Sequence, residues 1–143
     1  MNLDQILNKE ELNKEEIVYI FELREVLEGL AARRAASRIT DSQIKKLTSF
    51  FQPFADQKNI SNYKAYARED RRFHNFVIDV GAKEFLKSIL LTTNIISFSY
   101  QVLQSEGLVR PPNETIQEHL AVIEAIKDRD SEAAENLMRQ HFK

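Results

Sequence analysis

Apolar residues recur every three or four positions along most of this chain, the spacing at which a helix buries one face. No window alternates with a period of two for long, and the β-branched residues are scattered. Only three Gly and three Pro occur in 143 residues, too few for the many turns of a sandwich or a barrel. Since this length suits one hydrophobic core, the sequence predicts a single all-α domain.

Helix start and stop signals divide the chain at short intervals. Thr40 and Gln43 match a capping box, in which each side chain bonds the backbone of the other residue. Pro53 kinks or ends the helix that follows, and Gly81 closes the next one. Asp130 is the predicted N-cap of the last helix. The expected helices run over about 14–37, 41–51, 61–80, 83–106, 114–127 and 131–143.

Short connections between these helices are typical of an antiparallel bundle. Residues 1–14 are polar and form a lead-in segment, so the domain covers residues 15–143. The helix over 83–106 is apolar on most sides, which predicts that it is buried among the other helices. The expected inward residues of the first helix are Ile20, Leu23, Leu27, Leu30 and Ala31, and those of the last helix are Ala134, Leu137, Met138 and His141.

Composition and charge exclude several classes of protein. The chain has no Cys, which rules out disulfides, zinc ribbons and thiol catalysis. Its net charge of -2 leaves no basic footprint for nucleic acid on the chain as a whole. The first residues lack the apolar core of a signal peptide, and polar residues interrupt the most apolar stretch, 85–100. We therefore expect a cytoplasmic protein that does not span a membrane.

The three histidines all fall on apolar helix faces. His74 lies one turn after Asp70 on the inward face of its helix, where side chains four residues apart can converge. His119 and His141 belong to two helices that a short turn folds antiparallel. Because a buried, unpaired carboxylate is costly, Asp70 needs a partner. We therefore expect Asp70, His74, His119 and His141 to meet in the core.

Three imidazoles and one carboxylate are a donor set typical of a divalent transition-metal site. The set favours Zn²⁺ or Ni²⁺, with Mn²⁺, Fe²⁺ and Co²⁺ as alternatives, and it has too many nitrogen donors for Ca²⁺ or Mg²⁺. In a second interpretation no metal binds: His74 bonds Asp70, and the other two histidines bond the backbone or water. The residues alone leave both interpretations open.

The same residues carry a resemblance to a known family. The matching stretches are Glu22 to Ala36 (ELR..LE..AA..AA), Thr40-Asp41, Asp70 to His74 (D..FH), Glu118 to Asp130 (EH..I..AI..RD) and Ala134 to His141 (A...M..H). Their order and spacing cover nearly the whole chain. Together they resemble the FCD domain, the C-terminal effector-binding half of GntR-family transcription regulators of the FadR subfamily.

This resemblance implies an antiparallel bundle of six to seven helices around a central metal and ligand cavity. In the metal-binding branch of the family, a divalent metal lies at the cavity floor and keeps open positions, where a small carboxylate effector commonly coordinates. The metal ligands of that branch map onto Asp70, His74, His119 and His141. Effector binding then shifts the DNA-binding heads of a homodimer. Those heads are winged helix-turn-helix domains, for which this chain has no room.

Three residues are candidate effector contacts. Arg24 lies in the family-like first helix, where it either clamps an effector carboxylate or forms an exposed ion pair with Glu28. Many family members carry arginines along the fourth helix, but here Lys87 is its only internal base. Polar side chains, Asn94 and Gln101 among them, take that place.

The favoured function is therefore effector sensing and dimerisation in a transcription regulator, without enzyme activity. One alternative is a metal-dependent hydrolase, because an open metal position can activate water. Against it, no general base is placed, since Glu118 points about 100° away from its neighbour His119 on a helix. The other alternative is a metal-free helical dimerisation module, in which the histidines are ordinary core residues.

Overall fold

In the computed structural model, residues 14–56, 60–92 and 110–142 are described. Every regular element in these ranges is helical, which confirms the all-α prediction. The helices are α2 (Lys14–Arg38), α3 (Asp41–Ser49), α4 (Gln52–Ala55), α5 (Tyr63–Gly81), a segment over 84–92, α7 (Pro112–Lys127) and α8 (Ser131–His141). The predicted lead-in segment and most of the predicted fourth helix lie outside the described residues. None of the described helices is both long and apolar enough to cross a membrane.

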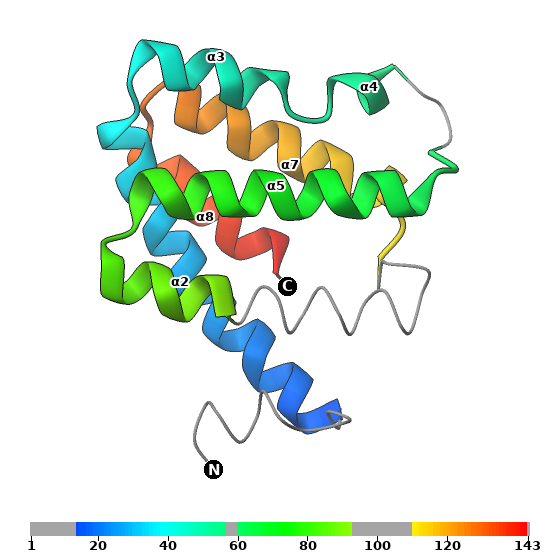
Figure 1. Ribbon diagram of the computed structural model, residues 1–143, viewed down its shortest axis with the longest axis horizontal. Helices are drawn as coiled ribbons and strands as arrows, with labels where there is room; N and C mark the ends of the chain where they lie inside the picture. The colour runs from blue at the N-terminus through cyan, green and yellow to red at the C-terminus, as the bar shows by residue number, and fades with distance from the viewer. Residues whose placement is uncertain (1–13, 57–59, 93–109, 143) are drawn as a thin grey trace.

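The longest helix, α2, is the element around which the others are arranged. It packs against α8, α5 and α7, and α7 in turn packs against α8 and α3. Figure 1 shows α3 and α4 along one side of the bundle, with α5 crossing the middle and α8 ending close to it. The candidate site described below takes its residues mainly from α2, α5, α7 and α8, which are also the helices that pack most extensively against one another.

Two of the predicted helix starts are confirmed by their caps. The Thr40 hydroxyl accepts a hydrogen bond from the Gln43 N–H at 3.2 Å, and the Gln43 side chain accepts one from the Thr40 N–H at 2.9 Å. The Asp130 carboxylate accepts from the Ala133 N–H at 3.1 Å. These bonds satisfy backbone groups that a helix start leaves without partners.

Between α3 and α4 the chain turns at Phe51, two residues before Pro53. Phe51 adopts a left-handed backbone conformation with φ of 67°, which is unusual for a bulky residue. Its N–H donates to the Glu69 carboxylate at 3.1 Å, and its side chain is completely buried. The Phe51 ring stacks on the ring of His119 with 4.5 Å between centroids. The turn therefore places an apolar wall against one of the predicted site residues.

Gly81 ends α5 as predicted, and it also allows two helices to approach closely. A Cβ atom at Gly81 would lie 1.9 Å from the carbonyl oxygen of Ala31 on α2. Only glycine leaves room for this contact. The other atoms nearest this position also belong to the backbone of Ala31 and Ala35, and both residues are buried. This close packing of α5 on α2 brings His74 next to Glu28.

Three predicted core positions are wrong. Leu23 on α2 is 45% exposed and Leu137 on α8 is 37% exposed, and Phe85, in the helix over 83–106 that was predicted to be buried, is 83% exposed. For Leu23 the reason is that α2 turns a different side inward, which carries Arg24, Glu28 and Ala31. An arginine and a glutamate thus occupy positions that hydrophobicity alone assigns to the surface. The predicted central cavity involves the fourth helix, most of which is not described, so it stays a prediction.

Candidate metal centre

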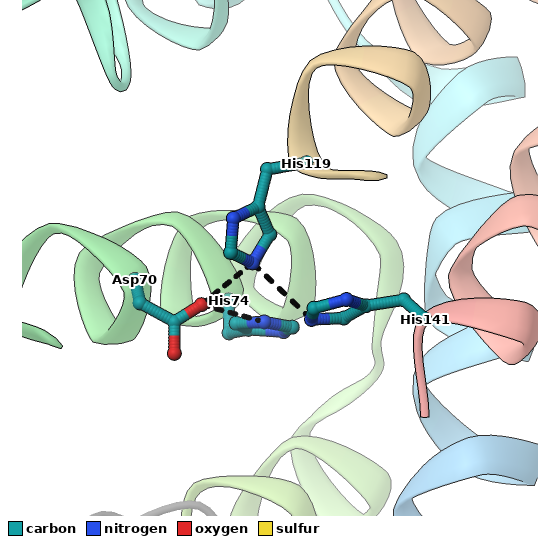
Figure 2. A group of neighbouring side chains, drawn as sticks. All are labelled: Asp70, His74, His119 and His141. Carbon is teal, nitrogen blue, oxygen red and sulfur yellow. Dashed lines mark hydrogen bonds and ion pairs between the residues drawn. The ribbon is translucent and has the colours of Figure 1, made fainter. Parts of the chain in front are cut away.

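The structure brings together the four side chains that the sequence singles out. Asp70, His74, His119 and His141 each offer one ligand atom, and these atoms lie within 4.8 Å of one another. Asp70 and His74 are one turn apart on α5, His119 lies in α7, and His141 is the last residue of α8. Figure 2 shows the three rings turned toward the Asp70 carboxylate.

Short contacts connect the ligand atoms of this group. His119 Nε2 lies 2.7 Å from Asp70 Oδ1 and 3.2 Å from His141 Nε2. His74 Nε2 lies 3.2 Å from the same Asp70 oxygen. Neighbouring ligands of an ion bound at about 2.0–2.1 Å are roughly 3 Å apart. These three separations are therefore close to those of neighbouring ligands around one ion.

The first histidine is held from α2 by a buried chain of charges. His74 Nδ1 lies 2.6 Å from Glu28 Oε1, and Arg24 Nε donates to Glu28 Oε2 at 2.6 Å. The Arg24 guanidinium lies over the ring of Phe142, 4.8 Å from its centroid. The prediction of an exposed Arg24–Glu28 pair is wrong, because the two side chains are 5% and 0% exposed. We call Arg24, Glu28 and His74 the inner arm.

A second chain of the same composition holds the last histidine. His141 Nδ1 lies 2.8 Å from Glu118 Oε1, and Arg110 donates to both carboxylate oxygens of Glu118 at 2.9 and 2.7 Å. Arg110 also donates to the backbone carbonyl of His141 at 3.3 Å. The side chains of Arg110, Glu118 and His141 are 38%, 32% and 10% exposed, and we call them the outer arm.

The third histidine has neutral partners. His119 Nδ1 lies 2.9 Å from the hydroxyl of Tyr66, and this hydroxyl lies 2.8 Å from that of Thr115. All three of these residues are buried. In each of the three histidines Nδ1 thus has a hydrogen-bonding partner, and Nε2 faces the shared point. Such outer partners fix the orientation of metal-binding imidazoles and the nitrogen that carries the proton.

The charges around the site shift its proton equilibria in opposite directions. Burial favours neutral His74, but Glu28 and Asp70 outweigh burial and raise the pKa of His74 to about 9. Burial lowers the pKa of His119 to about 4, despite the nearby Asp70. Burial acts to raise the pKa of Glu28 as well, but Arg24 and His74 lower it to about 2. The inner arm is therefore built from ionised groups, whereas His119 is neutral.

One atom of the site lacks a hydrogen bond. Asp70 Oδ1 is buried, and its contacts with His74 and His119 do not have hydrogen-bond geometry. A buried carboxylate oxygen in this condition is costly unless a cation lies beside it, and either protonated His74 or a bound metal ion supplies that charge. Three imidazole nitrogens and one carboxylate oxygen also suit a divalent transition metal chemically. The residues present therefore fit a metal ion at their meeting point.

Sequence reasoning missed the outer partners of the histidines. Glu28 was expected in a surface ion pair, and Glu118 was discounted because it points away from His119. Glu118 instead contacts His141, which comes from another helix. Tyr66 lies one helical turn before Asp70, but no signal in the local sequence assigns its hydroxyl to His119. Of the predicted effector contacts, Arg24 lies in the inner arm, while Asn94 and Gln101 lie outside the described residues.

Comparisons with known proteins show which family the chain belongs to. The sequence model of the FCD domain family matches residues 19–143. The chain belongs to the FCD domain family. This FCD domain is similar to the HTH-type transcriptional repressor NanR of Cronobacter sakazakii, with 25% identity over 128 residues. It is also similar to NanR of Escherichia coli K12, with 24% identity over 127 residues.

These alignments cover 88% of this chain but 48% of each NanR protein, so the chain spans about half the length of its curated relatives. A GntR-family regulator from Pseudomonas syringae pv. tomato superposes with a TM-score of 0.73 at 17% identity, covering 92% of this chain and 54% of that one. E. coli McbR/YncC superposes with a TM-score of 0.70 at 14% identity, covering 92% and 66%. The two structures share the fold.

The NanR relatives are named as transcriptional repressors, and the Pseudomonas syringae neighbour is named as a transcriptional regulator. The FCD domain is thus a regulatory, effector-binding type of domain, which argues against the hydrolase alternative. The site geometry agrees, because Glu118 is engaged with His141 and Arg110 and is not placed as a general base.

Proposed function

We propose that this FCD domain binds one divalent transition metal and senses a small carboxylate effector for a transcription regulator. The observation that carries the proposal is the meeting of one carboxylate and three imidazole nitrogens within 4.8 Å. The proposed ligands are Asp70 Oδ1 and the Nε2 atoms of His74, His119 and His141. The donor set favours Zn²⁺ or Ni²⁺, with Mn²⁺, Fe²⁺ and Co²⁺ as alternatives.

The inner and outer arms support this assignment because they prepare the imidazoles for metal binding. A carboxylate that accepts the Nδ1 proton leaves Nε2 with a free electron pair. Glu28 is placed to do this for His74, and Glu118 for His141. For His119 the acceptor is the Tyr66 hydroxyl, which can donate its own hydrogen bond to the Thr115 hydroxyl. Each ring is thus set to present the same nitrogen.

A bound metal would offer a Lewis-acidic position that an effector carboxylate can occupy. Arg24 stays a predicted effector contact, and its ion pair with Glu28 gives it the further task of neutralising a buried carboxylate. Asn94 and Gln101 stay predicted contacts from the fourth helix. The effector class is a small carboxylate, since metal and guanidinium groups both favour such an anion.

The whole regulator would act as a homodimer that contacts DNA through a separate winged helix-turn-helix domain. Support comes from the NanR relatives, which are named HTH-type transcriptional repressors and are about twice as long as the matched region. Effector binding can change DNA binding only if it favours one arrangement of the dimer over another.

The test is a thermal-shift panel of small mono-, di- and tricarboxylates, with and without saturating Zn²⁺ or Ni²⁺. We expect at least one acid to raise the melting temperature of metal-loaded protein and to have no effect on chelated protein. The His119→Ala variant should lose the metal-dependent response. An acid that stabilises chelated and loaded protein equally would contradict the proposed role of the metal. No response to any acid would contradict the carboxylate class.

A further inference from the structure

A groove lies on the face of α5 that points away from the metal centre. Arg72, Phe76 and Asp79 follow one another at intervals of four and three residues, so they share one face of the helix. Asp70 and His74 lie on the opposite face, because each residue turns the helix by about 100°. The groove has a volume of about 450 Å³ and is lined by α3, α5 and the helical segment after α5. Figure 1 shows α5 passing between these two neighbours.

The floor of the groove is apolar and largely aromatic. The rings of Phe50 on α3 and Phe76 on α5 lie 5.4 Å apart between centroids and are tilted by 58°. Phe50 is buried, whereas Phe76 is only partly buried and leaves apolar surface at the groove. Leu91 adds an aliphatic side chain from the segment after α5. A flat apolar group can pack on this floor through offset or edge-to-face ring contacts.

The rim of the groove is cationic. Lys46 Nζ lies 5.7 Å from the centroid of the Phe76 ring, and the Arg72 guanidinium lies 6.0 Å from that of Phe50. Arg72 also donates one N–H to Glu69 at 3.3 Å, but its side chain is 68% exposed. Within the described ranges no carboxylate pairs with Lys46. Both cations can therefore turn to an anion in the groove, because an exposed ion pair contributes little free energy.

One carboxylate lines the groove, and it already has a partner. Asp79 forms an ion pair with Lys87 of the segment after α5. This pair lies about two helical turns from Arg72 along α5, so it leaves the end with Lys46 and Arg72 to a ligand. Three cations thus line the groove with one carboxylate, although the whole chain has a net charge of -2. The local excess of positive charge favours an anionic ligand.

We propose that this groove binds a small aromatic anion, independently of the metal centre. The aromatic body packs on Phe50 and Phe76, and the anionic group lies between Lys46 and Arg72. Lysine and arginine side chains that lie over phenyl rings can also lie over an aromatic ligand, which favours flat rings over saturated ones. The proposal goes beyond the proposed function, because the groove uses none of the metal ligands and no residue of either arm.

The first test is an amide NMR titration with naphthoate, in which the shifts both locate the ligand and give its affinity. We expect the largest shifts around the groove, in α3 and α5. The Lys46→Gln/Arg72→Gln variant should bind at least about tenfold more weakly, since both charge-assisted contacts are lost. Lys45→Gln is the matched control, because Lys45 is the exposed neighbour of Lys46 and does not line the groove. No binding by the wild type, or equal binding by the double variant, would overturn the proposal.

Two analogues of naphthoate test the class of ligand. Naphthamide keeps the flat rings but carries no charge, and decahydronaphthoate keeps the charge on saturated rings. Each should bind at least about fivefold more weakly than naphthoate, because each lacks one of the two recognised features. Equal affinity for naphthamide would overturn anion recognition, and equal affinity for decahydronaphthoate would overturn the preference for an aromatic body.

A repeat of the titration with Zn²⁺-loaded and with chelated protein distinguishes this groove from the proposed effector site. We expect the same naphthoate affinity in both states, since the groove and the metal centre lie on opposite faces of α5. Loss of binding on chelation, with shifts centred on His74 and His119, would place the acid at the metal and overturn the groove. Binding in the groove by a protein that takes up no Zn²⁺ would contradict only the proposed metal function.

Discussion

The inner and outer arms contain the same three residue types in the same order, but they differ in solvent exposure. In the inner arm, Arg24, Glu28 and His74 are 5%, 0% and 2% exposed. In the outer arm, Glu118 and Arg110 are each about one-third exposed. A buried charge has no solvent to replace a lost partner, whereas a half-exposed charge has. The Arg–Glu–His interactions should therefore stabilise the fold in the inner arm. In the outer arm they should mainly affect metal affinity.

The largest expected effect comes from removing the charge of the inner carboxylate. Glu28→Gln keeps the shape of the side chain but removes the buried carboxylate charge that both Arg24 and His74 face. We expect the free energy of unfolding of metal-free protein to fall by about 3–5 kcal/mol, measured by urea denaturation. Glu22→Gln is the control, because Glu22 is exposed on the same helix. A loss below about 1 kcal/mol would show that the inner arm does not support the fold.

The second prediction concerns pH and follows from His74. Its pKa is about 9 in the folded protein, against an ordinary value of 6.5. Because the folded state binds this proton more tightly, the stabilisation is complete below pH 6.5 and is lost as the pH rises to about 9. We expect the free energy of unfolding of metal-free protein to fall by roughly 3 kcal/mol over this range. Denaturation experiments at a series of pH values measure this loss.

A bound metal should prevent this loss of stability at high pH. Zn²⁺ binds only the unprotonated ring, so its affinity rises over the same pH range and stability at saturating Zn²⁺ should not decline. The His74→Gln variant provides the control, since it lacks the titrating group. Metal-free wild-type protein whose stability is constant or increases between pH 6.5 and 9 would contradict the charge arrangement of the inner arm.

The smallest effect on stability is expected in the outer arm. Glu118→Gln should change the free energy of unfolding by less than about 1 kcal/mol, because water solvates Arg110 when its partner is lost. The same change should weaken Zn²⁺ binding about 10–100-fold, since Glu118 orients His141. Isothermal titration measures the affinity, and Glu114→Gln is the control, because the Glu114 carboxylate lies 3.7 Å from the same Arg110 but is not part of the outer arm. A stability loss equal to that of Glu28→Gln would remove the distinction between the arms.

Helical periodicity was sufficient to predict the all-α fold and the meeting of the four inward polar residues, and local start signals were sufficient to predict the caps at Thr40 and Asp130. It was not sufficient for the arms. A pair such as Arg24 and Glu28, four residues apart, has the same pattern on a surface as in a core, and only the packing of α5 and Phe142 makes it buried. Glu118 shows the same difficulty, because its partner His141 comes from another helix.

The left-handed turn at Phe51 also had no local signal, since such conformations usually carry glycine. Burial of the Phe51 ring against His119 and the hydrogen bond from its backbone to Glu69 compensate the unfavourable backbone. Both compensations are long-range contacts. Local sequence therefore specified the elements and their inward faces, whereas tertiary contacts decided how the site is supported.

The central claim is that Asp70 and the three histidines form a metal centre, and metal content tests it most directly. Dialysed protein is analysed by mass spectrometry and melted before and after chelation. We expect about one transition-metal equivalent per chain, a melting temperature that falls on chelation and recovers on Zn²⁺ or Ni²⁺ addition, and loss of the metal in His119→Ala. Absence of metal, together with an unchanged melting temperature on adding Zn²⁺, Ni²⁺ or Mn²⁺, would contradict the account.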